Sequence, residues 1–94
     1  HEDLARYIIE ISRASREDPQ IKLGISPRGS MHLAMACKAF ALVKGRHQVI
    51  AEDVQRLIPP VWDHRILPRH GRDNDSIHAH ELLQTILENI AVPR

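Results

Sequence analysis

Gly24-Ile25-Ser26-Pro27-Arg28-Gly29-Ser30 is the stretch that decides the fold, because it predicts the start of a long helix. Ser26 can act as the N-cap, and Pro27 has the fixed φ that suits the first helical position. A cation at Arg28 costs roughly 0.3–1 kcal/mol there, because free N–H groups and the macrodipole make this end positive. A phosphate would resolve the conflict, since helix N-termini hold phosphate and a guanidinium can grip it through two hydrogen bonds. The alternative is that Arg28 simply extends into solvent.

Composition is typical of one small globular domain. The 94 residues are 43% hydrophobic and 27% charged, and no apolar run approaches the length that a bilayer requires. The chain begins at His1 without an initiator methionine and ends abruptly at Val92-Pro93-Arg94. We therefore expect residues 1–94 to be a single domain, excised from a longer protein.

Charge and cysteine content narrow the function classes. Thirteen basic and twelve acidic residues leave a formal charge of +1, and single Phe, Tyr and Trp residues cannot build a base-stacking platform, which argues against nucleic-acid binding. The single cysteine, Cys37, excludes an internal disulfide framework and fits a reducing compartment. With no signal-like N-terminus, a cytoplasmic protein is expected.

The first half of the chain predicts two helices. Apolar residues recur at spacings of three and four over residues 2–17, which is typical of an amphipathic helix. Residues 21–24 are expected to connect it to a second helix, which runs from Pro27 to a C-cap at Gly45. This second helix is apolar nearly all round, so we predict that it is central and packed on several sides.

The second half predicts two more helices and no convincing strand. Glu52 and Asp53 place negative charge in the first turn of a third helix, which Pro59-Pro60 is expected to interrupt before a short turn over residues 61–64. A mobile surface loop is predicted from Leu67 to Asp75.

The last helix is expected to begin at Asp75 or Ser76 and to end before Val92-Pro93. Its apolar stripe consists of Ala79, Leu82, Leu83, Ile86, Leu87 and Ile90. The whole chain therefore predicts an all-α fold, a small bundle of about four helices.

The sequence gives little support for a metal site or for a nucleophilic catalytic residue. His78 and His80 lie two positions apart, about 200° around a helix, so they cannot share a metal without other ligands. Cys37 falls on the apolar helix, where a thiol is usually inert, and capping explains Ser26 and Ser30. Trp62 is expected to anchor the core or an interface.

An ordered set of motifs resembles the C-terminal lid of MoxR-type AAA+ ATPases, and the resemblance covers nearly the whole chain. The motifs are Ile21 to Ser30, Lys44-Gly45-Arg46, Val49, Glu52-Asp53-Val54, Val61, His64-Arg65-Ile66 and Ile90 to Pro93. The alanine-rich helix lies between the first and the second of them.

The resemblance implies a helical lid that packs on a nucleotide-binding core, with Arg28 as the sensor 2 arginine that detects the ATP γ-phosphate. Ser26, Pro27 and Gly29 would share this nucleotide-facing site. ATP and Mg²⁺ would belong to the parent protein, with none bound by this fragment alone, which carries no phosphate loop of the G-x-x-x-x-G-K-[ST] type. Whether Arg28 would serve its own subunit or a neighbour's nucleotide stays open.

The resemblance also implies rings, commonly hexamers, and chaperone-like assembly or metal-cofactor insertion, often with von Willebrand factor A domain partners. Two positions depart from the family pattern. Gly29 stands where alanine is usual, and Ile50-Ala51 stands where a Thr-Pro helix start is usual. The third helix therefore lacks its expected cap and depends on Glu52 and Asp53.

Two alternative functions remain on the residues alone. One is a stand-alone helical module for nucleic-acid binding or protein docking, with a basic edge made of Arg13, Arg16, Lys22 and Arg28. The other is a structural oligomerisation piece that uses an exposed Ile9, Trp62 and the last helix.

Overall fold

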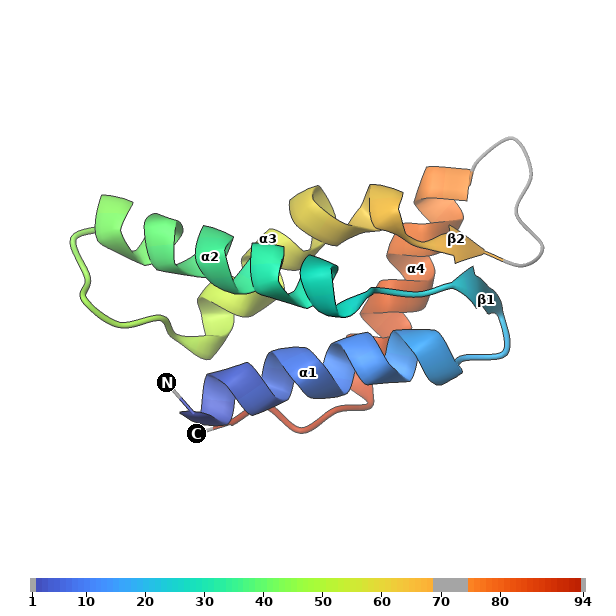
Figure 1. Ribbon diagram of the computed structural model, residues 1–94, viewed down its shortest axis with the longest axis horizontal. Helices are drawn as coiled ribbons and strands as arrows, with labels where there is room; N and C mark the ends of the chain where they lie inside the picture. Colours follow the sequence, from blue (N-terminus) through green and yellow to red (C-terminus); the bar gives the residue numbers. More distant parts are fainter. Residues whose placement is uncertain (1, 69–74, 94) are drawn as a thin grey trace.

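The computed structural model describes residues 2–68 and 75–93. Within these ranges, four α-helices account for most of the chain, as the all-α prediction requires, together with a short two-stranded sheet (Figure 1). In chain order the elements are α1 (Glu2–Glu17), β1 (Ile21–Leu23), α2 (Pro27–Val43), α3 (Ala51–Trp62), the 3-10 turn η1 (Asp63–Arg65), β2 (Leu67–Pro68) and α4 (Asp75–Glu88).

The helices pack around one apolar core. The first helix has the predicted bounds and buries Tyr7, Ile8 and Ile11 against the other helices. The last helix contributes most of its predicted stripe, with Ala79 and Leu83 fully buried. Figure 1 shows α1 and α2 side by side, while α4 crosses behind the connection from β1 to α2 and packs against α1. No helix in the described part of the chain is long and apolar enough to cross a lipid bilayer.

The second helix is less enclosed than its composition predicts. It starts at Pro27 and ends at Val43, and its C-cap is Lys44 rather than the predicted Gly45, which follows the cap with a φ of 77° that favours glycine. Its buried residues are Gly29, Leu33, Cys37 and Ala41, which lie along one face. α2 does pack against both α3 and α1, as the expectation of packing on several sides requires, but its remaining side is open and presents apolar side chains to solvent. These exposed side chains are Met31, Met35, Leu42 and Val43.

The third helix continues through both prolines. The predicted interruption at Pro59-Pro60 is wrong, because α3 runs from Ala51 to Trp62 before the short turn η1 begins. Each proline removes one helical N–H donor, which is a local cost. Burial on both sides of the prolines offsets this cost, since Ile58 and Trp62 are both fully inaccessible to solvent.

A small antiparallel sheet replaces part of the predicted connections. β1 pairs with β2, with Ile21 opposite Pro68 and Leu23 opposite Leu67. The prediction of no strand was wrong, because two short segments that are unremarkable alone become a pair once the helices bring them together. Pro68 is buried, so the predicted loop begins with a packed residue. Residues 69–74 of that loop lie outside the described residues, as do the side chains of residues 75–77.

Candidate functional site

Arg28 lies in the first turn of α2, one residue after Pro27, which occupies the first helical position as predicted. Ser26 is the N-cap, with extended backbone (φ −77°, ψ 165°), and its hydroxyl accepts the Gly29 N–H at 3.1 Å. The Ser30 N–H donates to the Ser26 carbonyl at 3.0 Å. Pro27 has no N–H, so the Arg28 N–H is the one donor of this turn left without a partner among the described residues.

The Arg28 side chain is exposed and forms no hydrogen bond or ion pair with any residue that the structure describes. The two terms that make this end of α2 positive, the helix dipole and the guanidinium, are therefore not balanced by an internal carboxylate. The site can accept an anion on two donors of different kinds, a backbone N–H and a guanidinium.

The backbone that precedes Arg28 is tied to α1 by two hydrogen bonds. The Ser15 hydroxyl accepts the Ile25 N–H at 2.9 Å and itself donates to the Ser12 carbonyl at 2.6 Å. The Arg16 guanidinium donates to the Ile25 carbonyl at 2.6 Å. Both backbone groups of Ile25 are thus held by consecutive residues of α1, which fixes the direction in which α2 begins.

Gly24 allows this close approach. A Cβ added there would lie 2.7 Å from backbone atoms of Ser15 and Arg16, which cannot move aside without bending α1. Any other residue at this position would push the connection away from α1. In the stretch from Gly24 to Ser30, the glycine is therefore explained by packing against α1 and the serine at position 26 by capping of α2.

Trp62 anchors the same turn from the opposite side. Its indole Nε1–H donates to the Gly29 carbonyl at 3.0 Å, and the ring is fully buried. A Cβ added to Gly29 would lie 2.9 Å from the Ile25 Cγ2 and 3.9 Å from the indole nitrogen. The first turn of α2 is therefore held by α1, through Ile25, and by the last residue of α3.

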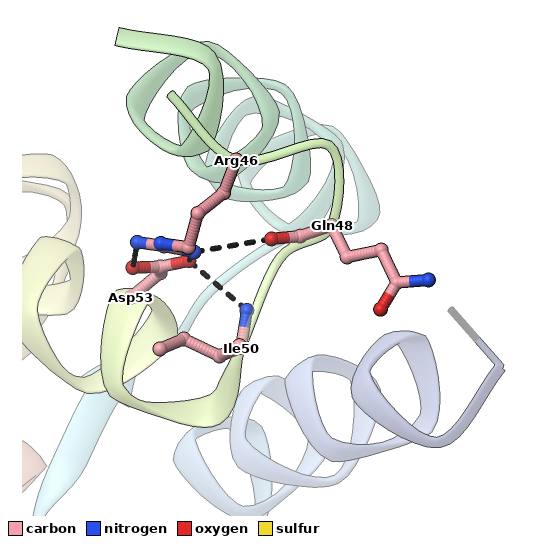
Figure 2. Close-up of polar contacts among 4 residues, drawn as sticks. All are labelled: Arg46, Gln48, Ile50 and Asp53. Carbon is pink, nitrogen blue, oxygen red and sulfur yellow. Dashed lines mark hydrogen bonds and ion pairs between the residues drawn. The ribbon is translucent and has the colours of Figure 1, made fainter. Parts of the chain in front are cut away.

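A second polar cluster lies at the far end of α2, where the chain turns into α3. Arg46 donates from both terminal nitrogens to the two carboxylate oxygens of Asp53, at 2.8 and 2.7 Å, and also to the Gln48 carbonyl at 3.1 Å (Figure 2). Asp53 in turn accepts the Ile50 N–H at 3.0 Å. This last bond is one half of a capping box, in which the side chain at N3 accepts the N–H of the N-cap residue; Ile50 has no side-chain oxygen to supply the other half.

The Arg46 hydrogen bonds hold the pKa of Asp53 below its usual value, although burial of the carboxyl acts in the opposite direction. Asp53 is 2% exposed and Arg46 is 33% exposed, so the pair is closed to solvent on one side. The pair forms a structural clamp, because both of its charges are already satisfied within the turn.

The cysteine and one of the histidines that were considered as functional residues have structural contacts. Burial, followed by the negative charge of Asp53, raises the pKa of the Cys37 thiol to about 11, so the reactive thiolate is disfavoured at neutral pH. The His80 ring contacts a carboxylate oxygen of Asp63 at 2.9 Å. No group of three potential metal ligands was found in the described ranges.

Comparison with known proteins identifies the fold. The family model of the AAA lid domain matches residues 13–86. The chain belongs to the AAA lid domain family. It is 35% identical over 92 residues to the uncharacterized protein YeaC of Bacillus subtilis, and 30% identical over 103 residues to the chaperone MoxR1 of Mycobacterium tuberculosis. The predicted resemblance to the lids of MoxR-type AAA+ ATPases is confirmed.

This lid makes up a minor part of its relatives. The two alignments cover 98% and 100% of the lid but only 29% and 27% of the relatives. In three dimensions the lid matches a candidate ATPase from Cytophaga hutchinsonii with a TM-score of 0.84 and 24% identity, covering 100% of the lid and 31% of that chain. At this identity, the structural likeness supports the fold alone.

The structure bears on both alternative functions, the oligomerisation piece and the module with a basic edge. Trp62 is fully buried, so it cannot serve an oligomerisation surface, whereas Ile9 is exposed as that alternative expects. Arg13, Lys22 and Arg28 are exposed, but Arg16 of the proposed basic edge is used to hold Ile25. The positioning roles of Ser15, Arg16 and Gly24 were missed, because nothing in their local spacing links α1 to the start of α2.

Proposed function

We propose that this lid places Arg28 against the phosphates of an ATP molecule held by an AAA+ core, as a sensor 2 arginine. The observation that carries the proposal is the contrast between an anchored backbone and a free side chain. Ile25 and Gly29 are fixed by hydrogen bonds to α1 and α3, whereas Arg28 is exposed without an internal partner among the described residues. Such a guanidinium is preorganised for a ligand that arrives from outside the lid.

The residues of the first turn fit a phosphate. Arg28 would hold it through its guanidinium and its backbone N–H, Ser26 and Pro27 set the turn, and Gly29 keeps the close contact with Ile25. A bound nucleotide supplies the phosphoanhydride and its Mg²⁺. The lid supplies positive charge at a fixed position, and the guanidinium of Arg28 would lose its anionic partner when the γ-phosphate leaves. Loss of this contact would release the lid, which couples hydrolysis to movement.

For the parent protein, the family relationship favours an ATPase that acts as a chaperone-like remodelling or assembly factor. We expect the lid to pack on its own AAA+ core and to contact neighbouring subunits in a ring, commonly a hexamer. A von Willebrand factor A domain partner and a cytoplasmic location are parts of the same proposal. Arg28 could serve the nucleotide of its own subunit or that of a neighbour.

The test is ATP turnover of the full-length protein with Arg28→Ala. We expect the turnover to fall roughly 10- to 100-fold, which corresponds to the loss of one charge-assisted contact of about 1.5–3 kcal/mol. Arg28→Lys keeps the charge without the planar fork, so it should retain intermediate activity.

Lys22→Ala is the matched control, because Lys22 is another exposed cation that the basic-edge alternative also uses. Its turnover should equal that of the unmodified protein. Unchanged turnover in Arg28→Ala, or equal losses in Arg28→Ala and Lys22→Ala, would reject the assignment. Mixing Arg28→Ala subunits with unmodified subunits then distinguishes action within a subunit from action on a neighbour, because only the latter changes the turnover of unmodified subunits.

A further inference from the structure

A polar cleft of about 340 Å³ lies where the end of α2 meets the first turns of α3. It is at the opposite end of α2 from Arg28, roughly 24 Å along a helix that rises about 1.5 Å per residue (Figure 1). None of the residues that line it belongs to the turn that carries Arg28. The residues of this α2–α3 cleft that bear on binding are Phe40, Lys44, Arg46, Glu52, Asp53 and Arg56.

The Phe40 ring attracts two cations from different parts of the chain. The Lys44 Nζ lies 5.5 Å from the ring centre, and the Arg56 Cζ lies 5.9 Å from it. A cation at this distance is attracted by the negative face of the ring. Lys44 and Arg56 are both exposed, whereas Phe40 is half-buried. The ring therefore gathers two like charges at the solvent side of the cleft.

Neither cation forms an ion pair within the part of the chain that the structure describes. Glu52 precedes Arg56 by four residues, a spacing that favours an ion pair on a helix, but the pair does not form. The end of α2 accounts for a cation at Lys44, because the C-terminus of a helix is negative. It does not account for Arg56, which lies in the second turn of α3, near a positive helix end.

The clamp between Arg46 and Asp53 closes one wall of the cleft (Figure 2). Arg46 uses both terminal nitrogens on the Asp53 carboxylate, which is 2% exposed. Asp53 acts on Arg56 only at a distance, through its charge. The exposed charges that a ligand meets are therefore those of Lys44, Arg56 and Glu52, with positive charge in excess.

We propose that the α2–α3 cleft binds an acidic segment of a partner protein, with one carboxylate against Lys44 and another against Arg56. Charge complementarity identifies this occupant, because anions placed beside the ring relieve the repulsion between the two cations. A single free anion binds weakly at an exposed site, whereas a segment with two carboxylates engages both cations at once. The Ile50 N–H, which a phosphate could use at this helix start, is already bonded to Asp53.

The experiment measures binding of two labelled synthetic peptides of equal length to the full-length protein by fluorescence anisotropy. One peptide alternates glutamate with glycine and serine, and the other has glutamine in place of every glutamate. We expect the glutamate peptide to bind at least about fivefold more tightly, and its affinity to fall as salt rises. Inorganic tripolyphosphate, added as a competitor at the same concentration of charge, should displace it less effectively than unlabelled glutamate peptide does.

Two double variants that remove the same charge locate the binding. Lys44→Gln combined with Arg56→Gln should weaken the glutamate peptide by about 3- to 30-fold, because both carboxylate contacts are lost. Arg13→Gln combined with Lys38→Gln is the matched control, since it removes two exposed cations that do not line the cleft. Its affinity should stay within about twofold of that of the unmodified protein.

Carbodiimide cross-linking gives a direct readout, because it joins a carboxylate to a lysine amine that it contacts. Mass spectrometry should find the glutamate peptide attached to Lys44 and not to Lys38. Arg28→Ala should bind the peptide as the unmodified protein does, so this proposal and the nucleotide assignment of Arg28 fail independently.

Several outcomes would overturn the proposal. These are equal binding of the two peptides, binding of neither, equal losses in the two double variants, and a cross-link at Lys38 instead of Lys44. Displacement by tripolyphosphate as effective as that by unlabelled peptide would also overturn it, because the cleft would then be a general anion site rather than a site for an acidic segment.

Discussion

Gly29 lies where two side chains converge on the first turn of α2. The Trp62 indole donates to its carbonyl, and the Ile25 side chain fills the space where a Cβ would stand. The glycine that stands where the resemblance predicts alanine thus has a packing reason in this chain. Glycine costs the helix some stability, but it lets Ile25 and Trp62 approach the backbone.

We expect Gly29→Ala to lower the free energy of unfolding by about 1 kcal/mol. Alanine would favour the helix by about 0.5–1 kcal/mol, whereas crowding the buried Ile25 at 2.9 Å costs about 1–3 kcal/mol, so crowding prevails. Urea denaturation monitored by Trp62 fluorescence measures the difference. Ala39→Gly, on the exposed side of α2, is the control that isolates helix propensity. An increase in stability for Gly29→Ala would contradict the packing argument.

For single residues, the sequence predicted the features that depend only on residues nearby in the chain. Ser26 as N-cap and Pro27 at the first helical position are local preferences, and both are confirmed. The contacts that hold the turn, from Ser15 and Trp62, join residues 10 and 33 positions apart. No periodicity or spacing encodes such pairs, so they could not be found without the structure.

Among the elements, α3 shows how burial overrides local preference. Two consecutive prolines predict a break, but the helix continues because Ile58 and Trp62 both reach the core. The opposite error concerns α2, where composition predicts burial on several sides and the structure leaves one side open. Apolar content alone did not distinguish a face that packs in the core from a face that is exposed to solvent.

The clamp between Arg46 and Asp53 belongs to the connection between α2 and α3. Because the folded pKa of Asp53 lies below its usual value, the clamp stabilises the fold fully at neutral pH and is lost as pH falls below about 4. Asp53→Asn should therefore cost roughly 1–3 kcal/mol at pH 7, and its deficit against the unmodified chain should shrink toward pH 3.

Urea titrations of both chains across this pH range give the deficit directly. Glu52→Gln is the matched control, because Glu52 is an exposed carboxylate in the same turn without the clamp. It should change stability little at any pH. A deficit in Asp53→Asn that stays constant from pH 7 to pH 3 would show that the Asp53 charge is not what stabilises the connection.

Across the whole molecule, α2 connects two polar centres with different duties. Its first turn carries Arg28, which has no partner among the described residues, whereas the connection that follows its last residue carries Arg46, which is paired with Asp53 of α3. Ser15→Ala should destabilise the lid by about 1–3 kcal/mol, because it leaves the Ile25 N–H without an acceptor. Arg46→Ala should cost a similar amount, because Asp53 loses its partner.

The two variants should differ in activity. Ser15→Ala loosens the connection that aims Arg28, so turnover per folded full-length molecule should fall, by up to about 100-fold if the guanidinium moves by an ångström. Arg46→Ala should leave turnover per folded molecule unchanged. Folded fraction is measured by circular dichroism and turnover by phosphate release. Equal losses in both variants would indicate that activity follows stability rather than the aim of Arg28.

The Trp62 hydrogen bond to Gly29 has a consequence for the order of folding. It closes a loop of 33 residues, so the start of α2 cannot reach its final form until the end of α3 has been synthesised and has docked. A nascent chain released before that point would carry its arginine on an untethered turn. The turn that carries Arg28 is therefore expected to reach its final form late in folding.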